Sequence, residues 1–144
     1  MKQKSLKKNY LVSSDLSEVQ KTSKKVLLFL KPLDLNSGTL FDIRLCLEEA
    51  LINAMKYGND LKKNLKVNLT VAFDKHQVWL SVEDQGKGFD PNTVSNCTKK
   101  KGLMRDCGRG VYLMHRLMDK VQYNQKGNRV EMVKLFKRRA NHGS

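Results

Sequence analysis

The chain has 144 residues, of which 40% are hydrophobic, and this is enough for the core of one domain and excludes disorder as the default. Lys and Arg number 28 against 14 Asp and Glu, so the formal net charge of +14 indicates a polyanionic partner, such as nucleic acid, a nucleotide or an acidic protein face. No apolar run is long enough to span a bilayer, and residues 1–10 lack a secretory signal, so we expect a cytoplasmic chain. The three cysteines fit no paired spacing, so we expect neither disulfides nor structural zinc.

Hydrophobic periodicity predicts the elements of the first half of the chain. We expect a strand at Lys4–Val12 and a helix at Asp15–Leu30, which Pro32 stops. A second helix is expected from about Thr39 to Tyr57, because apolar residues recur there at spacings of three and four. Gly58-Asn59-Asp60 then predicts a left-handed cap at the end of this helix.

Alternating apolar residues predict an antiparallel hairpin in the second half. Its strands are expected at Val67–Phe73 and Val78–Val82, around the turn Asp74-Lys75-His76. A loop rich in Gly and Lys follows at Gln85–Gly108, and a loop of this length inside a domain is usually functional or mobile. The last expected elements are one short helix and two strands, at Arg109–Asp119, Val121–Asn124 and Arg129–Phe136.

This order of elements, β-α-α-β-β-loop-α-β-β, predicts the fold class. Helices come in blocks and neighbouring strands can pair antiparallel. We therefore expect an α+β fold, a two-layer α/β sandwich with helices on one face of a mixed, largely antiparallel sheet.

The first polar motif is Glu49 with Asn53 on the second expected helix. Their spacing of four residues places both on one face, beside the apolar stripe. A carboxylate there can take a proton, and an amide oxygen one turn later can hold a hydrated Mg²⁺. The alternative is a solvated edge of an amphipathic helix. The adjacent Glu48 points about 100° away and follows Arg44 by four residues, which suits a surface ion pair.

The second motif begins at Asp84, after the hairpin. Asp84 continues the buried face of the preceding strand, so its carboxylate needs a donor partner, for which the exocyclic amino group of a purine is suitable. Gly86 and Gly88 remove side chains where the backbone must turn and approach a ligand. The alternative is a strand end followed by an ordinary turn.

The third motif is Cys107-Gly108-Arg109-Gly110-Val111, which opens the short helix after the long loop. Unpaired N–H groups at a helix start, with glycines beside them, favour phosphate. Arg105, Arg109 and the run Lys99–Lys101 add positive charge. The alternative is a plain loop-to-helix junction.

In their order and spacing, the three motifs resemble the GHKL (Bergerat-fold) ATP-binding superfamily and, within it, the bacterial anti-sigma factor serine/threonine-protein kinases. The resemblance covers roughly Lys4 to Phe136. It implies a Bergerat-type fold in a single kinase domain at residues 1–144, with an ATP lid at about 86–109 and a basic tail at about 137–144. The most similar stretches are Leu47–Ala54, Val82–Pro91, Gly108–Met114 and Leu117–Asp119.

The resemblance also implies a role for each matching residue, with ATP and Mg²⁺ as cofactors. Glu49 would be the general base of the kinase, Asn53 would hold Mg²⁺, and Asp84 would bond the adenine amino group. The other residues expected to bind ATP are Gly86, Gly88, Phe89, Arg105, Gly108, Arg109, Gly110 and Val111.

Two positions depart from the family pattern. Asp106 stands close to the point where relatives often carry an Arg for the terminal phosphate, so Arg105 or Arg109 would have to replace it. Gly127-Asn128 stands where many relatives have Gly-Thr beside the adenine. That contact is either lost here or made by the Asn128 amide.

As a function, the resemblance implies an ATP-dependent protein serine kinase and anti-sigma factor that acts by partner switching. The expected partners are a sigma factor, an antagonist protein phosphorylated on Ser and a second copy of the chain, with no direct contact to nucleic acid or membrane. One alternative is a catalytically inactive ATP-binding module that sequesters a regulatory partner. The other is a small basic nucleic-acid-binding protein, which predicts aromatic residues among the basic ones, whereas aromatic residues are only 7% of the chain.

Overall fold

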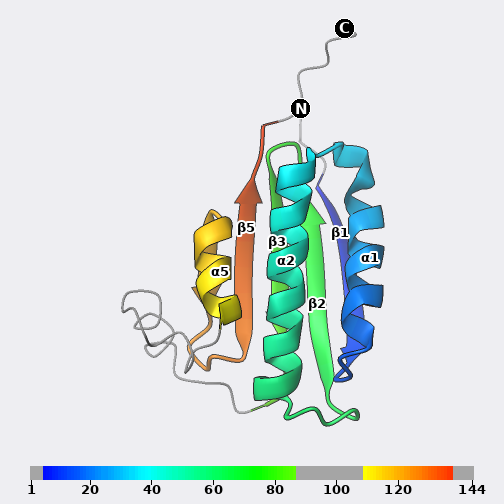
Figure 1. Ribbon diagram of the computed structural model, residues 1–144, viewed down its shortest axis with the longest axis vertical. Coiled ribbons are helices and arrows are strands. Elements are labelled where there is room, and N and C mark those ends of the chain that lie inside the picture. Colours follow the sequence, from blue (N-terminus) through cyan, green and yellow to red (C-terminus); the bar gives the residue numbers. More distant parts are fainter. Residues whose placement is uncertain (1–4, 87–108, 138–144) are drawn as a thin grey trace, which may run out of the picture.

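The computed structural model describes residues 5–86 and 109–137, which form a sheet with helices along one face (Figure 1). Most of the expected lid and tail lie outside these ranges. The strands are β1 Leu6–Ser13, β2 Lys66–Phe73, β3 Gln77–Glu83, β4 Lys120–Tyr123 and β5 Arg129–Leu135. The helices are α1 Glu18–Leu30, α2 Ser37–Asn53 and α5 Arg109–Leu117, with a short 3-10 helix η1 at Lys31–Leu33 and a π-helical turn η2 at Ala54–Gly58.

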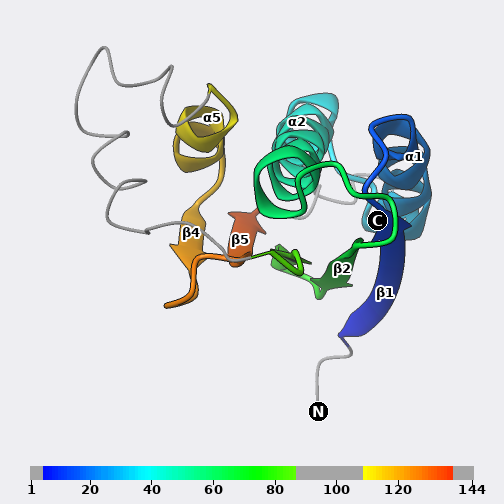
Figure 2. The ribbon, with the colours of Figure 1, turned by 90° about the horizontal axis from the view of Figure 1, so that it is seen from below.

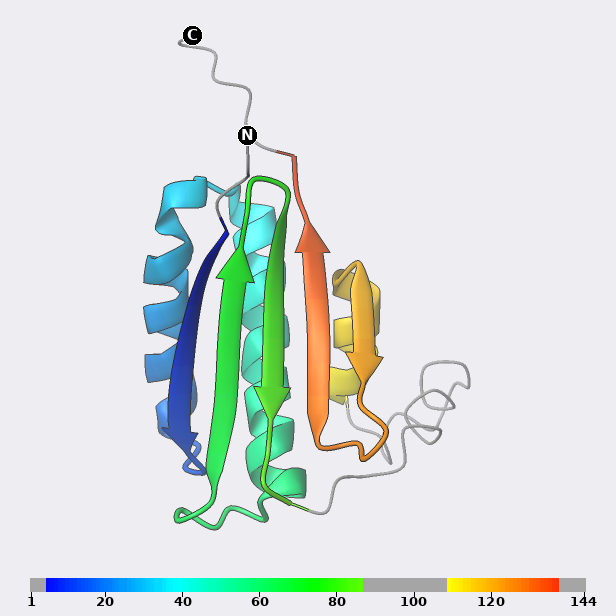
Figure 3. The same cartoon turned by 180° about the vertical axis from the view of Figure 1, so that it is seen from behind.

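The strands of the sheet follow the order β1-β2-β3-β5-β4. Seen from below, the helices form a second layer (Figure 2), and no described helix covers the opposite face of the sheet (Figure 3). The expected α+β two-layer sandwich is therefore confirmed. The described strands contain no parallel pair, in contrast to the mixed sheet expected, because β5 lies between β3 and β4 and runs antiparallel to both.

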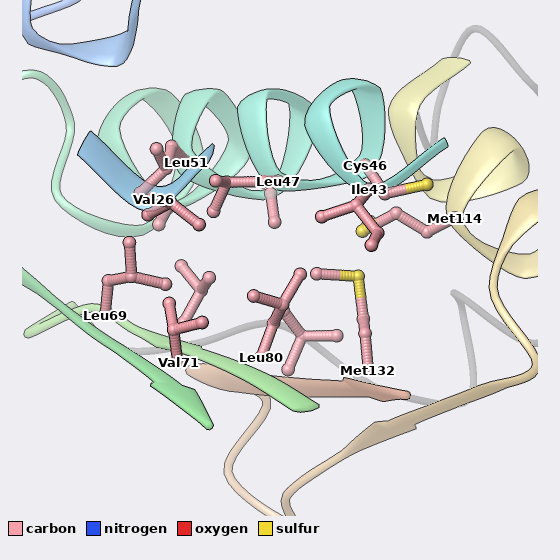
Figure 4. Packing of buried hydrophobic residues seen from close by; sticks show 14 of the residues in the cluster. Val26, Ile43, Cys46, Leu47, Leu51, Leu69, Val71, Leu80, Met114 and Met132 are labelled. Atoms are coloured by element: carbon pink, nitrogen blue, oxygen red, sulfur yellow. The ribbon is translucent and has the colours of Figure 1, made fainter. Parts of the chain in front are cut away.

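Helix α2 is oriented by the core that it covers. Its apolar side chains Ile43, Leu47 and Leu51 are fully buried against the sheet, where Leu80 of β3 and Met132 of β5 meet them (Figure 4). Burying a side chain of this size contributes about 1.5–3 kcal/mol relative to leaving it exposed. With this face held against the sheet, the polar row beside it has a defined direction.

The two ends of α2 differ in how their backbone groups are satisfied. At the first end, the Oδ1 atom of Asn36 accepts the N–H of Thr39 at 2.8 Å, which is a side-chain cap. At the second end the helix widens into the π turn η2. The left-handed conformation expected within Gly58-Asn59-Asp60 is found at Asp60 and continues at Leu61, both with φ of 54°.

The hairpin turn and the last helix also follow from local hydrogen bonds. The Oδ1 atom of Asp74 accepts the N–H groups of His76 and Gln77 at 2.8 and 3.0 Å, so the expected turn is confirmed. Helix α5 ends at Leu117, two residues earlier than expected. Asp119 pairs with β5 instead, because its N–H donates to the carbonyl of Val133 at 2.9 Å.

Candidate functional site

A row of polar side chains on α2 faces α5 and β5. The Oδ2 atom of Asp42 lies 3.1 Å from Nζ of Lys134 on β5, and Sγ of Cys46 lies 3.9 Å from the carbonyl oxygen of Leu113 on α5. Glu49 and Asn53 continue this row along the helix, at the spacing that places residues on one face. The row therefore lies in the angle between α2 and α5.

Glu49 and Glu48 have different surroundings. Burial, followed by repulsion from the Asp42 carboxylate, raises the pKa of the Cys46 thiol to about 12, and the charge of Glu49 adds to this rise. Glu49 follows Cys46 by three residues, so the two side chains lie on the same side of α2. Glu48 instead lies 3.8 Å from Arg44 in the expected surface ion pair. Cys46 itself packs in the core, where Figure 4 shows it beside Ile43.

Asn53 is the last residue of α2, and the nitrogen of its side-chain amide is buried. The Nδ2 atom is buried and makes no hydrogen bond with any residue in the described ranges. Such a group is destabilising unless a ligand or another polar group satisfies it. The Nδ2 group of Asn53 can therefore donate a hydrogen bond to a ligand.

Asp84 lies at the end of β3 and is 7% exposed, as the alternation of the strand predicts. Its Oδ1 atom accepts the N–H of Gly86 at 2.8 Å. Burial raises the pKa of this carboxyl, and the bond from Gly86 opposes the rise. Within the described residues, no hydrogen bond reaches Oδ2. One oxygen is therefore held by the protein and the other is available to a ligand.

Gly58, at the end of η2, brings the first two motifs into contact. A Cβ added at Gly58 would lie 2.2 Å from Cγ of Asp84, and one added at Gly86 would lie 1.7 Å from the carbonyl oxygen of Gly58. No larger residue fits either position without movement of the carboxylate or the backbone. The helix that carries Glu49 and Asn53 therefore ends directly on the Asp84 turn.

The turn between β4 and β5 holds Asp84 from the other side. The N–H of Asp84 donates to the carbonyl of Asn128 at 2.8 Å, and Nδ2 of Asn128 donates to the carbonyl of Asp84 at 3.0 Å. The Oδ1 atom of Asn128 accepts from Nδ2 of Asn124 at 2.7 Å. The Asn128 amide thus anchors the backbone of Asp84, a role that the sequence comparison with Gly-Thr did not suggest.

The third motif is described in part. Helix α5 begins at Arg109, so Gly110 and Val111 lie in its first turn. This turn lies at the same end of the molecule as the ends of α2 and β3, the lower end in Figure 1. The other predicted site residues, Gly88, Phe89, Arg105 and Gly108, lie outside the described residues.

Asn59 is a site-adjacent residue that sequence reasoning missed. The sequence places it only within the expected helix cap, yet it is fully buried and its side chain bonds three separate segments. One of these bonds holds Gln85, the neighbour of Asp84. The sequence around Asn59 does not indicate these hydrogen bonds, because the fold brings all three partners to it from other segments of the chain.

Chemically, the described residues provide a buried acceptor at one point and an unsatisfied amide and a helix start nearby. An acceptor with one available oxygen suits an amino group in a flat heterocycle. The start of α5 presents N–H groups that suit phosphate. The arrangement can therefore hold a ligand with a basic or amino-bearing ring and a polyanionic tail.

Comparison with known proteins agrees with this arrangement. The family model of the histidine kinase-like ATPase domain matches residues 12–134. The anti-sigma F factor of Anoxybacillus flavithermus is 30% identical over 112 residues, which are 76% of each chain. The serine-protein kinase RsbW of Bacillus subtilis is 29% identical over 105 residues, 66% of this chain and 64% of that protein.

A solved structure supports the fold. The RsbU and RsbW domains of a Mycobacterium tuberculosis protein superpose with a TM-score of 0.61 at 12% sequence identity. The match covers 92% of this chain and 32% of that one. Among the described residues, no helix is both long and apolar enough to cross a membrane.

Proposed function

The chain belongs to the histidine kinase-like ATPase domain family, and on that premise we propose that it is an ATP-dependent protein serine kinase and anti-sigma factor. Membership of an ATPase family implies ATP binding. The relatives named anti-sigma F factor and serine-protein kinase support the two activities. In this proposal the chain binds a sigma factor, and a small antagonist protein in its unphosphorylated form competes with the sigma factor for the chain. The chain phosphorylates the antagonist on a serine.

The observation that carries the proposal is the contact between Gly58 and Asp84. Through this contact, the helix that carries Glu49 and Asn53 ends on a buried acceptor at the end of β3, the central strand of the sheet. An ATP molecule with its adenine at Asp84 then directs its phosphates toward Asn53 and the start of α5.

Asp84 recognises the adenine in this proposal. The buried carboxylate keeps Oδ1 on the N–H of Gly86 and uses Oδ2 to accept a hydrogen bond from the exocyclic amino group. Such a bond to a charged acceptor contributes about 1.5–3 kcal/mol. It also relieves the cost of burying the carboxylate, which the raised pKa of Asp84 reflects.

Asn53 is the proposed ligand of Mg²⁺ on the phosphates. In this role the Oδ1 atom of Asn53 would coordinate the cation, since an amide carbonyl oxygen is a normal ligand for a hard cation. The buried Nδ2 atom, which has no partner among the described residues, would donate to a phosphate oxygen. When bound, the cation neutralises charge on the phosphate oxygens during transfer. The described residues supply one protein ligand, which agrees with a cation that keeps several waters.

Glu49 is the proposed general base. It accepts the proton of the attacking serine hydroxyl as the serine oxygen bonds to the terminal phosphorus and the bond to ADP breaks. The new phosphoserine carries roughly 1.5 to 2 negative charges. We propose that this charge separates the antagonist from the chain, which is then free to bind its sigma factor.

The same proposal includes the setting of the protein. The chain is a single domain over residues 1–144, with residues 86–109 as the ATP lid and 137–144 as a basic tail, and it acts as a homodimer in the cytoplasm. The net charge of +14 supports acidic faces on its protein partners. Nucleic acid is not among the proposed partners.

The proposal is tested with a matched pair of variants, Glu49→Ala and Glu48→Ala. Phosphate transfer to candidate antagonist proteins and ATP affinity are measured in parallel. Glu49→Ala should slow transfer by about 10²–10⁴-fold with ATP affinity unchanged. Glu48→Ala should transfer at close to the wild-type rate, because its carboxylate is engaged with Arg44 on the surface.

Other results would contradict specific parts of the proposal. If Glu48→Ala loses phosphate transfer and Glu49→Ala keeps it, then Glu48 is the general base and the proposed role of Glu49 is wrong. ATP binding without transfer by the wild type to any antagonist would favour the inactive binding module. Failure of the wild type to bind ATP would overturn the proposal as a whole.

A further inference from the structure

Asn59 is buried with every hydrogen-bonding group of its side chain satisfied. It is 0% exposed. Its Nδ2 atom donates to Oγ of Ser14 at 2.9 Å and to the carbonyl of Lys66 at 3.0 Å. Its Oδ1 atom accepts the N–H of Gln85 at 2.8 Å. A buried amide used to this extent holds its partners in one arrangement, because leaving any of them unpaired is costly.

The three partners of Asn59 come from three different segments. Ser14 directly follows β1, Lys66 begins β2, and Gln85 follows Asp84 after β3. Asn59 itself follows η2, the turn that ends α2. The side chain therefore ties the end of the helix to the sheet and to the Asp84 turn at one point.

The consequence for Asp84 follows from the bonds on its two sides. Asn128 holds the N–H and the carbonyl of Asp84 itself, and Asn59 holds the N–H of the next residue, Gln85. With the peptide units on both sides restrained, the direction of the Asp84 carboxylate is restrained as well. Its Oδ1 atom bonds Gly86, which leaves Oδ2 with one orientation to present to a ligand.

We propose that Asn59 is a positioning residue that sets the selectivity of the site for a nucleobase with an exocyclic amino group. This rests on the proposed function, in which Asp84 accepts a hydrogen bond from adenine. Selectivity of this kind requires a rigid acceptor, because a carboxylate that can turn away tolerates an exocyclic carbonyl oxygen in place of the amino group. Asn59 supplies the rigidity and does not touch the base.

The test compares the affinities for ATP and ITP, in which a carbonyl oxygen replaces the amino group. Wild-type protein should bind ATP at least about tenfold more tightly than ITP, since the carbonyl of ITP faces a carboxylate oxygen. In Asn59→Ala this preference should fall to within about threefold, mainly through weaker ATP binding. A role in folding alone would lower both affinities equally and keep the preference.

Two further variants serve as controls. Asn36→Ala removes the side-chain cap of α2 by the same chemical change, so it should lower the melting temperature and keep the preference for ATP. In an Asp84→Asn background, Asn59→Ala should change the preference no further, because both substitutions act through the same carboxylate. If Asn59→Ala does not fold, Ser14→Ala can replace it. This substitution removes one of the three hydrogen bonds of the Asn59 side chain, so it should also lower the preference for ATP over ITP, by a smaller factor.

The outcomes separate this inference from the function on which it rests. A wild type that binds ATP no better than ITP contradicts the adenine role of Asp84. If the wild type prefers ATP and Asn59→Ala (or Ser14→Ala in its place) keeps the full preference, only the positioning role of Asn59 is overturned. Additive effects of Asn59→Ala and Asp84→Asn on the preference would also overturn it.

Discussion

Substitution of Gly58 by alanine tests the junction between the helix motif and the buried carboxylate. Gly127 is the one described glycine with a positive φ, so the backbone at Gly58 itself accepts an alanine. The obstacle is the Asp84 side chain, because the added Cβ would lie 2.2 Å from both Cγ and Oδ2. The carboxylate must therefore move, while the surrounding helix and strand can remain.

The size of the effect follows from this distance. Carbon atoms make contact at about 3.5–4.0 Å, so the carboxylate has to shift by about 1.3 Å or more. A hydrogen bond that starts at about 2.9 Å does not survive such a shift. Loss of about 1.5–3 kcal/mol from a charge-assisted bond corresponds to roughly 10- to 150-fold weaker ATP binding.

Titration calorimetry with ATP measures this change, and Gly38→Ala is the matched control. Gly38 is on the same helix, and a Cβ there would meet its nearest atom, Oδ1 of Asn36, at an ordinary 3.5 Å. The control should bind ATP like the wild type and melt at the same or a slightly higher temperature. Wild-type affinity in Gly58→Ala, with the variant folded, would refute the placement of adenine at Asp84.

Three further outcomes are expected. ATP affinity should fall as the pH is lowered through the raised pKa of Asp84, because the protonated carboxyl is a poorer acceptor for the hydrogen bond from the amino group. Calorimetry across about pH 4 to 7 measures this fall, which should be absent in Asp84→Asn. Gly127→Ala should lower the free energy of unfolding by about 1–2 kcal/mol in urea denaturation, because φ at this turn is 81°. With the other two cysteines replaced by serine, a thiol reagent at pH 8 should modify Cys46 only in denaturant, since burial raises the pKa of its thiol to about 12; rapid labelling of folded protein would contradict this.

Much of the fold could be predicted because periodic patterns report on local structure. The alternation in β2 and β3 and the apolar stripe of α2 correspond to buried residues in the structure. The burial of Asp84 followed from the same alternation. The ion pair of Glu48 with Arg44 followed from helical spacing. In each case the deciding contacts lie within one element or on one face of it.

Features that depend on distant partners could not be predicted in this way. Gly58 was expected only as part of the capping run Gly58-Asn59-Asp60, whereas its lack of a side chain serves the contact with Asp84, 26 residues further along the chain. Asn128 was compared with a threonine beside the base, whereas its amide bonds Asp84 and Asn124. Asn59 had no pattern to mark it. These roles come from the meeting of segments in space, which composition and periodicity do not encode.

The pairing of β3 with β5 has a consequence for how the domain tolerates changes in length. These strands are neighbours, with Glu83 opposite Arg129, although the chain makes a long excursion between them. The stretch from β3 to α5 begins at the sheet and ends on a helix that packs against α2. The entropic cost of closing a loop grows only slowly with its length, by about 0.6 kcal/mol for each doubling. Insertions or deletions in this stretch should therefore leave the framework folded, so it is the region where new recognition properties can be grafted at least risk to stability.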